Sequence, residues 1–293
     1  MGPNSHSDLI LNPDGSVYHL HLLPGDVAST VILVGDPGRV KQVSEHFETI
    51  EIRRENREFV SHTGHYKGKR LTVLSTGIGT DNIDIVLNEL DALVNVDLER
   101  RVIKPVKSVL RLIRLGTSGA LHPEIVPGAT ILSKVAGGFD GLYHYYKDEN
   151  KVSIPGLTES FMKHSKWKEE LPHPYFVSCS PRLSALFEND ARHAGITIST
   201  PGFYGPQVRG IRLHPFDEGL IEKIGSFTFE GLRITNFEME CSALYALSAM
   251  LGHEALTICV AIANRITESF LEDYKPHVDE LILNTLNNLL KND

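Results

Sequence analysis

The sequence predicts a single α/β domain, and three observations support this prediction. Short runs of β-branched and aliphatic residues, typical of buried strands, alternate with segments of helical periodicity along the chain. Composition does not shift within the 293 residues in a way that marks a linker or a second domain. The apolar fraction of 41% is that of an ordinary globular protein with a sizeable core. We therefore treat residues 17–293 as one domain, preceded by a polar, turn-rich segment, residues 1–16, that we expect to be flexible.

Composition also argues against several classes of partner. The formal net charge of −8 leaves no basic excess for nucleic acid. No run approaches eighteen apolar residues, and the N-terminus lacks a basic-then-apolar signal pattern, so we expect no membrane span. Cys179, Cys241 and Cys259 are too few and too scattered for a disulfide framework or a zinc site. We expect a cytoplasmic protein that has no metal site and carries its cysteines in the core.

The first hundred residues contain clear strand and helix signals. Apolar residues recur at helical spacing after Asp81, which can cap a helix, and Lys67-Gly68-Lys69 has the character of a hairpin turn. The elements expected here are an extended arm at 17–22, a buried strand at 31–34, a helix at 40–47, a hairpin of 58–66 with 71–75, a helix from 81 to about 94, and a charged surface excursion at 95–108.

The strand at 31–34 runs directly into Gly35-Asp36-Pro37-Gly38-Arg39 and then into a helix. This order of strand, glycine turn and helix is a common anion-site geometry, because N–H groups of the turn and the helix N-terminus point at one spot. The segment has no phosphate-loop lysine, so a plain turn between a strand and a helix stays open as the alternative.

Residues 109–119 predict the end of a buried strand followed by a sharp glycine turn. Apolar residues stand at 109, 110, 112, 113 and 115, and Gly116 and Gly119 would let the backbone approach a ligand closely. Between them Thr117 and Ser118 offer hydroxyl and N–H donors, and Arg114 adds a planar cation that matches a phosphate. The alternative is an ordinary turn in which Arg114 forms a structural ion pair.

The remaining elements continue the alternation. Ser180-Pro181 marks a helix start and Gly195 its expected stop, by the preference for proline early and glycine late. The elements expected after residue 120 are a strand at 129–135, a loop at 143–146, a helix around 161, a helix from 181 to 195, a strand at 196–199, an ordered loop at 201–216, an apolar helix opened by 236–240 and ending at 251–252, a buried strand at 255–263, and a terminal helix at 279–290.

Two acids, Glu238 and Glu240, stand at the expected start of the apolar helix. They can be first-turn acids that complement the helix dipole. The helix behind them is apolar almost all round and therefore buried, so its acids need partners, and sugar hydroxyls are suitable ones.

The segment 203–209 carries a set of side chains suited to a planar ring. Gln207 donates and accepts hydrogen bonds at once, and Arg209 offers up to five donors in one plane. Together they match a ring with adjacent carbonyl and N–H groups, against which Phe203 can stack. The alternative is a structured loop whose arginine ties down carbonyl groups.

These segments together resemble the nucleoside phosphorylase family, and within it the members that cleave uridine. The resemblance covers most of residues 17–290 and rests on ordered motifs: Tyr18-His19-Leu20, Gly35 to Arg39, Arg57-Glu58-Phe59, Ser75 to Gly79, Arg114 to Gly119, Phe203 to Arg209, Asn236 to Glu240, and Asn264-Arg265. It implies three layers, with a central mixed, partly barrel-like β-sheet flanked by helices. It also implies a glycosyltransferase of pyrimidine salvage, which converts uridine and phosphate into uracil and ribose 1-phosphate. Deoxyuridine and thymidine are further candidate substrates.

The resemblance also implies roles for individual residues. Phosphate, as co-substrate, would be held by Gly35, Arg39, Arg114 and Thr117, and by Arg57 from a neighbouring subunit. Ribose would be held by Met239, Glu240 and Thr117, with Glu238 close by and His19 contributed by the partner. The base would lie between Phe203, Gln207 and Arg209. Catalysis would rest on Arg209, Gln207, Glu240 and Arg114, in a homo-oligomer, dimer or hexamer, with active sites at subunit interfaces.

In three places this chain differs from some members of the family, and two of these differences bear on what it binds. Residues 261–265 contain no acid, whereas purine-cleaving hexamers of the family carry an aspartate there to protonate the base, so a pyrimidine is favoured. Residues 95–108 look like an insertion. Asn82 stands where some relatives place a serine that forms a potassium site with Glu58. This difference argues against potassium binding, and we expect no cofactor. The alternatives are a purine nucleoside phosphorylase, a nucleosidase that uses water, and a non-catalytic nucleoside-binding protein.

Overall fold

The computed structural model describes residues 5–148 and 151–291, and within these ranges twelve strands form one mixed sheet. A separate pair, β5 (Val96–Asp97) and β6 (Val102–Ile103), forms a small hairpin in the charged excursion after the second helix. The strands of the main sheet are β1 (Thr30–Val34), β2 (Thr49–Asn56), β3 (Phe59–Tyr66), β4 (Lys69–Ser75), β7 (Arg111–Ala120), β8 (Thr130–Gly138), β9 (Tyr175–Ser178), β10 (His193–Ser199), β11 (Thr228–Phe229), β12 (Leu232–Glu238), β13 (Glu254–Asn264) and β14 (Ser269–Phe270).

Five of these strands close into a barrel. The main path runs β11-β12-β10-β8-β13-β7-β1-β4-β3-β2, and β12 additionally pairs with β7, which closes the ring β7-β13-β8-β10-β12. The closing contacts are antiparallel and join Asn236 to Ala120 and Phe237 to Gly119. The carboxyl ends of β7 and β12 therefore meet. The expected mixed, partly barrel-like sheet is confirmed.

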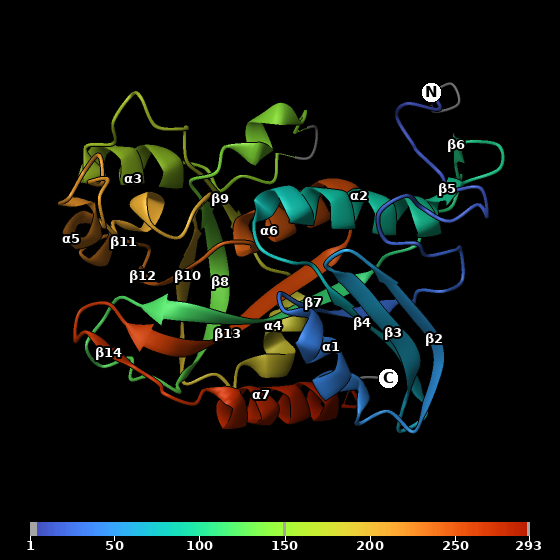
Figure 1. Ribbon diagram of the computed structural model, residues 1–293. Coiled ribbons are helices and arrows are strands. Elements are labelled where there is room, and N and C mark those ends of the chain that lie inside the picture. Colours follow the sequence, from blue (N-terminus) through green and yellow to red (C-terminus); the bar gives the residue numbers. More distant parts are fainter. Residues whose placement is uncertain (1–4, 149–150, 292–293) are drawn as a thin grey trace.

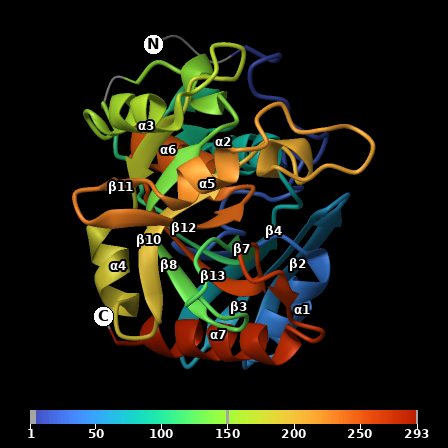
Figure 2. The ribbon, with the colours of Figure 1, turned by 90° about the vertical axis from the view of Figure 1, so that its left-hand side faces the viewer.

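Helices cover the sheet on both sides, which gives the expected three layers (Figures 1 and 2). One layer contains α2 and α6, which pack on each other, and the opposite layer contains α1, α4 and α7. The helices are α1 (Pro37–Ser44), α2 (Thr80–Asn95), α3 (Leu157–Ser165), α4 (Pro181–Phe187), α5 (Leu220–Gly225), α6 (Cys241–Leu251) and α7 (Lys275–Asn288), with short 3₁₀ turns η1 (Leu142–Tyr145) and η2 (Gly205–Gln207).

Capping residues explain where several helices begin. Asp36 accepts a hydrogen bond from the Gly38 N–H (2.8 Å), so α1 starts at Pro37, earlier than residue 40, and it ends at Ser44. Ser180 caps α4 as expected, accepting from the Leu183 N–H (3.3 Å). Helix α2 lacks a side-chain cap: Asp81 lies inside its first turn, and Gly79 occupies the N-cap position.

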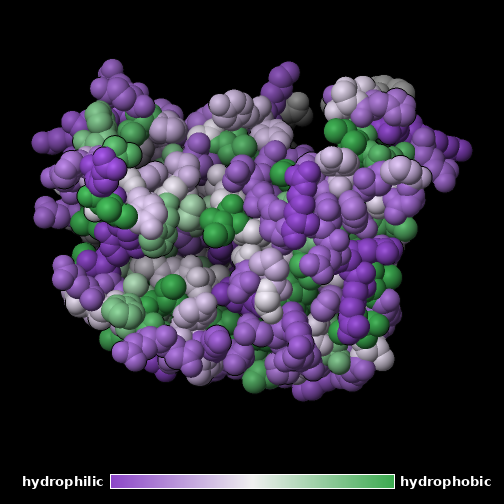
Figure 3. All heavy atoms as spheres, viewed as in Figure 1, coloured by the Kyte–Doolittle hydropathy of each residue, from purple (hydrophilic) through white to green (hydrophobic). Residues whose placement is uncertain are grey.

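The buried hydrophobic residues form one large cluster, which includes β1 and α2, and two smaller ones, which include Phe161 and Ile125 respectively. All three cysteines are buried and unpaired, which confirms their expected role as small core residues. Hydrophobic residues on the face shown in Figure 3 are scattered among hydrophilic ones. Among the described residues, no helix combines the length and apolar character that a membrane span requires. Residues 5–16 form turns and a bridge between Leu11 and Val17, and residues 1–4 lie outside the described range, so the flexibility of 1–16 stays a prediction.

The expected extended arm at 17–22 is wrong. The segment folds into a turn in which the Val17 N–H donates to the Leu22 carbonyl (3.0 Å) and His21 has a φ of 53°. Val17, Leu20 and Leu22 are all buried, so their spacing reflects a turn packed on the core and not the alternation of a strand.

Glycines at two places were expected to end an element and instead lie inside strands. The sharp turn expected at Gly116 to Gly119 is absent, because β7 continues as a strand to Ala120. Helix α4 ends at Phe187, and Gly195 lies inside β10. A Cβ at Gly195 would lie 2.6 Å from the Arg233 carbonyl oxygen of the neighbouring β12. Close packing between strands accounts for this glycine.

Other expectations are confirmed with shifted ends. The hairpin appears as β3 and β4, the helix near residue 161 as α3, the buried strand near 255–263 as β13, and the terminal helix as α7. Residues 201–216 form the expected loop, which contains the short 3₁₀ turn η2. The largest correction concerns residues 236–238, which are the end of strand β12 and not the opening of a helix.

Candidate active site

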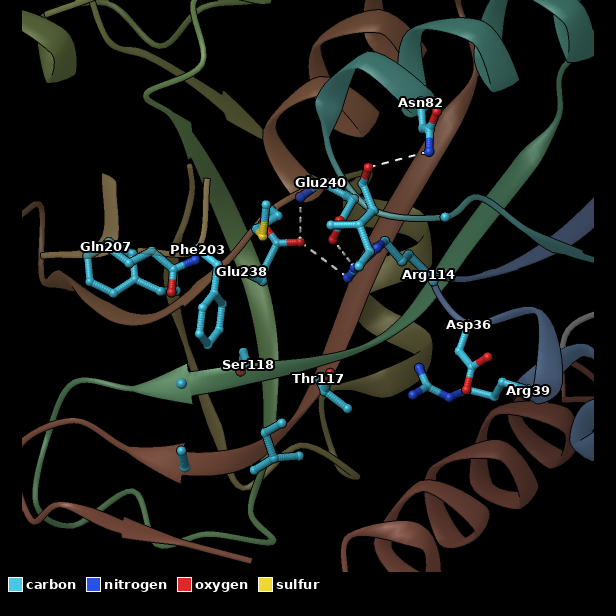
Figure 4. Close-up of a pocket in the computed structure, with 18 of the residues that line it drawn as sticks. Asp36, Arg39, Asn82, Arg114, Thr117, Ser118, Phe203, Gln207, Glu238 and Glu240 are labelled. Atoms are coloured by element: carbon cyan, nitrogen blue, oxygen red, sulfur yellow. Dashed lines mark hydrogen bonds and ion pairs between the residues drawn. The ribbon is translucent and has the colours of Figure 1, made fainter. Parts of the chain in front are cut away.

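A cavity of about 750 Å³ opens where β1, β7 and β12 end. Figure 4 shows Phe203 and Gln207 on one side of it, Arg39 on the other, and Arg114 with the two glutamates between them. Within one subunit the cavity therefore collects the residues expected for phosphate, ribose and base: Gly35, Arg39, Arg114, Thr117, Phe203, Gln207, Arg209, Glu238, Met239 and Glu240.

The Arg114 guanidinium is buried between two carboxylates. Its Nη1 lies 3.2 Å from Glu238 Oε2, and its Nη2 forms an ion pair with Glu240 Oε2. Burial by itself lowers the pKa of Arg114, but the charges of Glu240 and Glu238 outweigh it and hold the pKa above the usual range. Arg114 therefore forms a structural ion pair and also lines the cavity, so the two interpretations of this arginine are not exclusive.

Gly116 makes room for this ion pair. A Cβ at that position would lie 2.2 Å from Arg114 Nη1 and 2.8 Å from Cys259 Sγ. The glycine interpreted as a turn former is therefore a strand residue across which the arginine side chain lies.

Glu238 is the last residue of β12, and its carboxylate has four partners, three hydrogen-bond donors and one cation. The Glu240 N–H (2.9 Å) and Cys241 N–H (3.0 Å) donate to it, as does the Ser199 hydroxyl at the end of the parallel strand β10, while Arg114 provides the ion pair. Burial raises its pKa to about 7, helped by the charge of Glu240 and opposed by Arg114.

Glu240 occupies the N-cap position of α6, so it precedes the helix and does not lie in its first turn. Its Oε1 accepts a hydrogen bond from the Gly79 N–H (2.7 Å), and its Oε2 pairs with Arg114. The backbone before α2 is thereby joined to the acid before α6. Glu238 accepts hydrogen bonds from the N–H groups at the start of α6, whereas Glu240 is bound by Gly79 and Arg114.

Arg39 is the second buried cation of the site. Its Nη1 donates to the Leu115 carbonyl (3.3 Å), and no carboxylate of the described residues forms an ion pair with it. Burial, followed by the like charge of Arg114, lowers its pKa. A buried guanidinium with mostly unused donors is a suitable ligand for an anion.

The base end of the cavity lies on the loop after β10. Arg209 Cζ lies 4.0 Å from the centre of the Phe203 ring, and Arg209 Nη1 donates to the Phe203 carbonyl (2.9 Å) and to Gln207 Oε1. Gln207 is buried and its Nε2 donates to Thr200 Oγ1 (2.9 Å). Burial, followed by the charge of Arg265, lowers the pKa of Arg209 to about 10.

His19 and Arg57 do not line this cavity. Arg57 stands in the turn between β2 and β3 with a φ of 55°, and His19 lines a different cavity beside the middle of α2. The two are neighbours: Asn56 Nδ2 donates to the His19 carbonyl (2.8 Å), and the His19 ring lies 6.4 Å from the Phe59 ring. Both residues were expected to act on the site of another subunit.

Glu58 and Asn82 are the positions at which some relatives bind potassium, and here both line the cavity beside Gly77. A Cβ at Gly77 would lie 2.5 Å from Asn82 Nδ2 and 2.9 Å from Glu58 Cγ. Within the described ranges, no cluster of three or more histidine, cysteine or acidic side chains could hold a metal ion.

Asn264, near the expected purine-specific position, donates to the carbonyls of His122 (2.7 Å) and Ile125 (2.9 Å), which fixes the end of β13.

Sequence reasoning missed several contributors to the site. Ser199 is the last residue of β10, parallel to β12, and Thr200 directly follows it, so knowledge of the strand pairing would have indicated both. Arg265 was noted in a motif without a role, and its Nη1 donates to the Gln207 carbonyl (2.9 Å). Gly79 contributes only a backbone N–H, and every residue except proline has one, so its residue type does not indicate this contact.

Comparison with known proteins agrees with this architecture. The chain is 32% identical over 260 residues to a uridine phosphorylase of Thermococcus kodakarensis, covering 88% of this chain and 80% of the relative. It is 27% identical over 277 residues to a DeoD-type purine nucleoside phosphorylase of Streptococcus suis, covering 93% and 95%. A Trypanosoma brucei nucleoside phosphorylase described as showing uridine phosphorylase activity superposes with a TM-score of 0.85 at 29% identity, covering 96% of this chain and 99% of that one. The model of the Phosphorylase superfamily matches residues 29–290, and the chain belongs to that family.

Proposed function

We propose that this protein catalyses the phosphorolysis of uridine to uracil and ribose 1-phosphate. The observation that carries the proposal is the division of one cavity into two ends, with Arg39 and the Arg114–glutamate cluster at one end and Gln207 with Arg209 at the other. Similarity in sequence to a relative named uridine phosphorylase, and in fold to a nucleoside phosphorylase described as showing uridine phosphorylase activity, supports the assignment.

Phosphate is assigned to the end with the two buried arginines. Arg39 and Arg114 carry two positive charges, which Glu238 and Glu240, when ionised, balance within the subunit. A phosphate dianion therefore gains from a further cation. We assign that cation to Arg57 of a neighbouring subunit, with Thr117 and the Gly35 backbone as neutral donors.

Ribose is assigned to the carboxylates between the two ends. Glu240 would accept hydrogen bonds from ribose hydroxyls while the Gly79 N–H and Arg114 hold its two oxygens in place. Met239 would pack against the sugar, Glu238 would fix the backbone that presents Glu240, and His19 of a neighbouring subunit would contact the 5′-hydroxyl.

Uracil is assigned to the end that holds Phe203, Gln207 and Arg209. As the bond between C1′ and N1 loosens, negative charge grows on the base and positive charge on the ribose. Arg209 and Gln207 would stabilise the base, and the bound phosphate would stabilise the ribosyl cation and then attack it with inversion. No side-chain nucleophile is required, because positioning and preorganised charge supply the catalysis.

Subunit assembly follows from the expected roles of His19 and Arg57. Because neither lines the cavity of its own chain, we propose an active homo-oligomer with shared sites, acting in the cytoplasm in pyrimidine nucleoside salvage. Size-exclusion chromatography coupled to an activity assay tests this: a strictly monomeric species with full activity would refute it.

The deciding experiment is a base-release assay on uridine, thymidine, inosine and adenosine, with and without phosphate. We expect phosphate-dependent release from uridine. Preference for inosine would indicate a purine nucleoside phosphorylase, and release without phosphate a nucleosidase. Binding without turnover of any substrate would indicate a nucleoside-binding protein.

A further inference from the structure

Glu89, in the middle of α2, makes an unusually complete set of contacts with His19. Its carboxylate accepts hydrogen bonds from the His19 N–H (3.0 Å to Oε1) and the Leu20 N–H (2.8 Å to Oε2), and its Oε1 lies 2.6 Å from His19 Nδ1. The side chain of Glu89 is 12% exposed and that of His19 is 26% exposed. One acid therefore holds both the backbone and the ring of this histidine.

The hydrogen-bond partners of Glu89 determine which ring nitrogen carries the proton. An ionised carboxylate that already accepts two backbone N–H groups has no proton to donate, so His19 Nδ1 must be the donor in their contact. In a neutral imidazole this leaves Nε2 as an acceptor with a free lone pair. Asn56 holds the backbone carbonyl of His19, and the edge-on contact with Tyr18 (ring centres 4.9 Å apart) further restricts the ring.

We propose that Glu89 is a positioning residue for catalysis: it holds His19 in the Nδ1–H tautomer so that Nε2 accepts a hydrogen bond from the 5′-hydroxyl of a nucleoside bound in the neighbouring subunit. This inference rests on the proposed function for the location of the nucleoside. Glu89 itself does not touch the substrate, and it acts through the orientation and the tautomer of His19.

The test compares uridine with 5′-deoxyuridine, which lacks the hydroxyl in question. Glu89→Gln keeps the shape of the side chain and removes its charge, so we expect it to lower the preference for uridine over 5′-deoxyuridine, measured as the ratio of kcat/KM values, by about five- to tenfold. The loss should appear mainly in KM for uridine. In a His19→Ala background, Glu89→Gln should change the ratio no further.

Asp91→Asn is the matched control. Asp91 lies on the same helix and pairs with a different histidine, His253, at 3.2 Å. Its loss should affect thermal stability and leave the uridine to 5′-deoxyuridine ratio unchanged. An equal loss with both substrates in Glu89→Gln would mean that Glu89 is merely structural and would overturn the proposal, as would a ratio that does not change.

A second measurement does not depend on which nucleoside is the substrate. The ¹⁵N NMR signals of the His19 ring, assigned by their absence in His19→Ala, should show the Nδ1–H tautomer in the ligand-free oligomer and a mixture in Glu89→Gln. A dominant Nε2–H tautomer in the unmodified protein overturns the inference. Failure of uridine cleavage with the expected tautomer present would instead count against the proposed function.

Discussion

The two ends of the cavity are built differently. At the phosphate and ribose end, Arg114, Glu238 and Glu240 are buried and belong to strands of the closed barrel or to the residues directly after them. At the base end, Phe203 is about half exposed and Arg209 belongs to a loop held by side-chain contacts. The part of the site that would perform the common chemistry is thus rigid, and the part that would select the base lies on the more adaptable backbone.

Arg114→Ala should have the largest effect and should act on both stability and activity. It would leave Glu238 and Glu240 buried without their cation, which costs about 3–5 kcal/mol of stability. We expect phosphate kcat/KM to fall by more than about 10³-fold, since a preorganised charge is also lost. Thermal denaturation and phosphate titration measure the two effects. Arg111→Ala, at the start of the same strand, is the control, and an unchanged phosphate dependence in Arg114→Ala would contradict the assignment of this end.

Arg209→Ala should reduce activity without a comparable loss of stability. Removal of one preorganised donor lowers kcat by about 10²–10³-fold, whereas the loop position of Arg209 makes the folded state less dependent on it. Steady-state kinetics with uridine and a melting curve separate the two effects. Arg212→Ala, an exposed arginine in the same loop, provides the comparison. Wild-type uridine turnover in Arg209→Ala would show that the base does not bind here.

The pair Gly116→Ala and Gly119→Ala tests the two ends within one strand. A Cβ at Gly116 would clash with Arg114, so we expect a loss of about 1–3 kcal/mol and a raised KM for phosphate. At Gly119 the nearest atom is Arg265 Cγ at 3.7 Å, an ordinary contact, and Arg209 Nη2 lies at 3.9 Å. We expect little change in stability there and an effect confined to KM for the nucleoside. Equal destabilisation by both changes would argue against the ion-pair role of Gly116.

The smallest expected effect is a pH dependence. Burial raises the folded-state pKa of Glu238 to about 7, above its unfolded value of 4.5. Its contribution to stability is therefore fully present below about pH 4.5 and is lost as pH rises through about 7. The difference in unfolding free energy between the wild type and Glu238→Gln should fall across this window, by no more than about 1.4 kcal/mol per pH unit, and level off above it. A difference that is constant with pH would contradict the raised pKa.

Local signals predicted the strands and helices better than they predicted their roles. The hairpin of β3 and β4 was identified because its strands and turn are adjacent in sequence. Glu238 and Glu240 were placed on a helix because the apolar run after them has helical spacing. Glu238 is instead the last residue of β12, and Glu240 follows two residues later. That strand is fixed by pairing with β10 and β7, which are distant in sequence.

The sequence predicts which residue types form the site better than it predicts which of those residues contact one another. The motif at 112–119 indicated a buried arginine near glycines, but the partners of Arg114 are the last residue of β12 and the residue that precedes α6, more than a hundred residues later. Gly116 was expected to bend the chain, whereas it accommodates a guanidinium. Glu89 gave no signal at all, because its value lies in a contact with a residue seventy positions away.

Closure of the barrel also bears on misassembly. An open strand edge presents unpaired N–H and C=O groups that can recruit a strand from another molecule. The additional pairing of β12 with β7 removes such edges from the ring that carries Arg114 and Glu238. At one end of the sheet, β2 remains an edge strand, and it carries the charged side chains of Glu51, Arg53, Arg54 and Glu55. The strands that hold the ion pair are therefore among those least open to strand exchange.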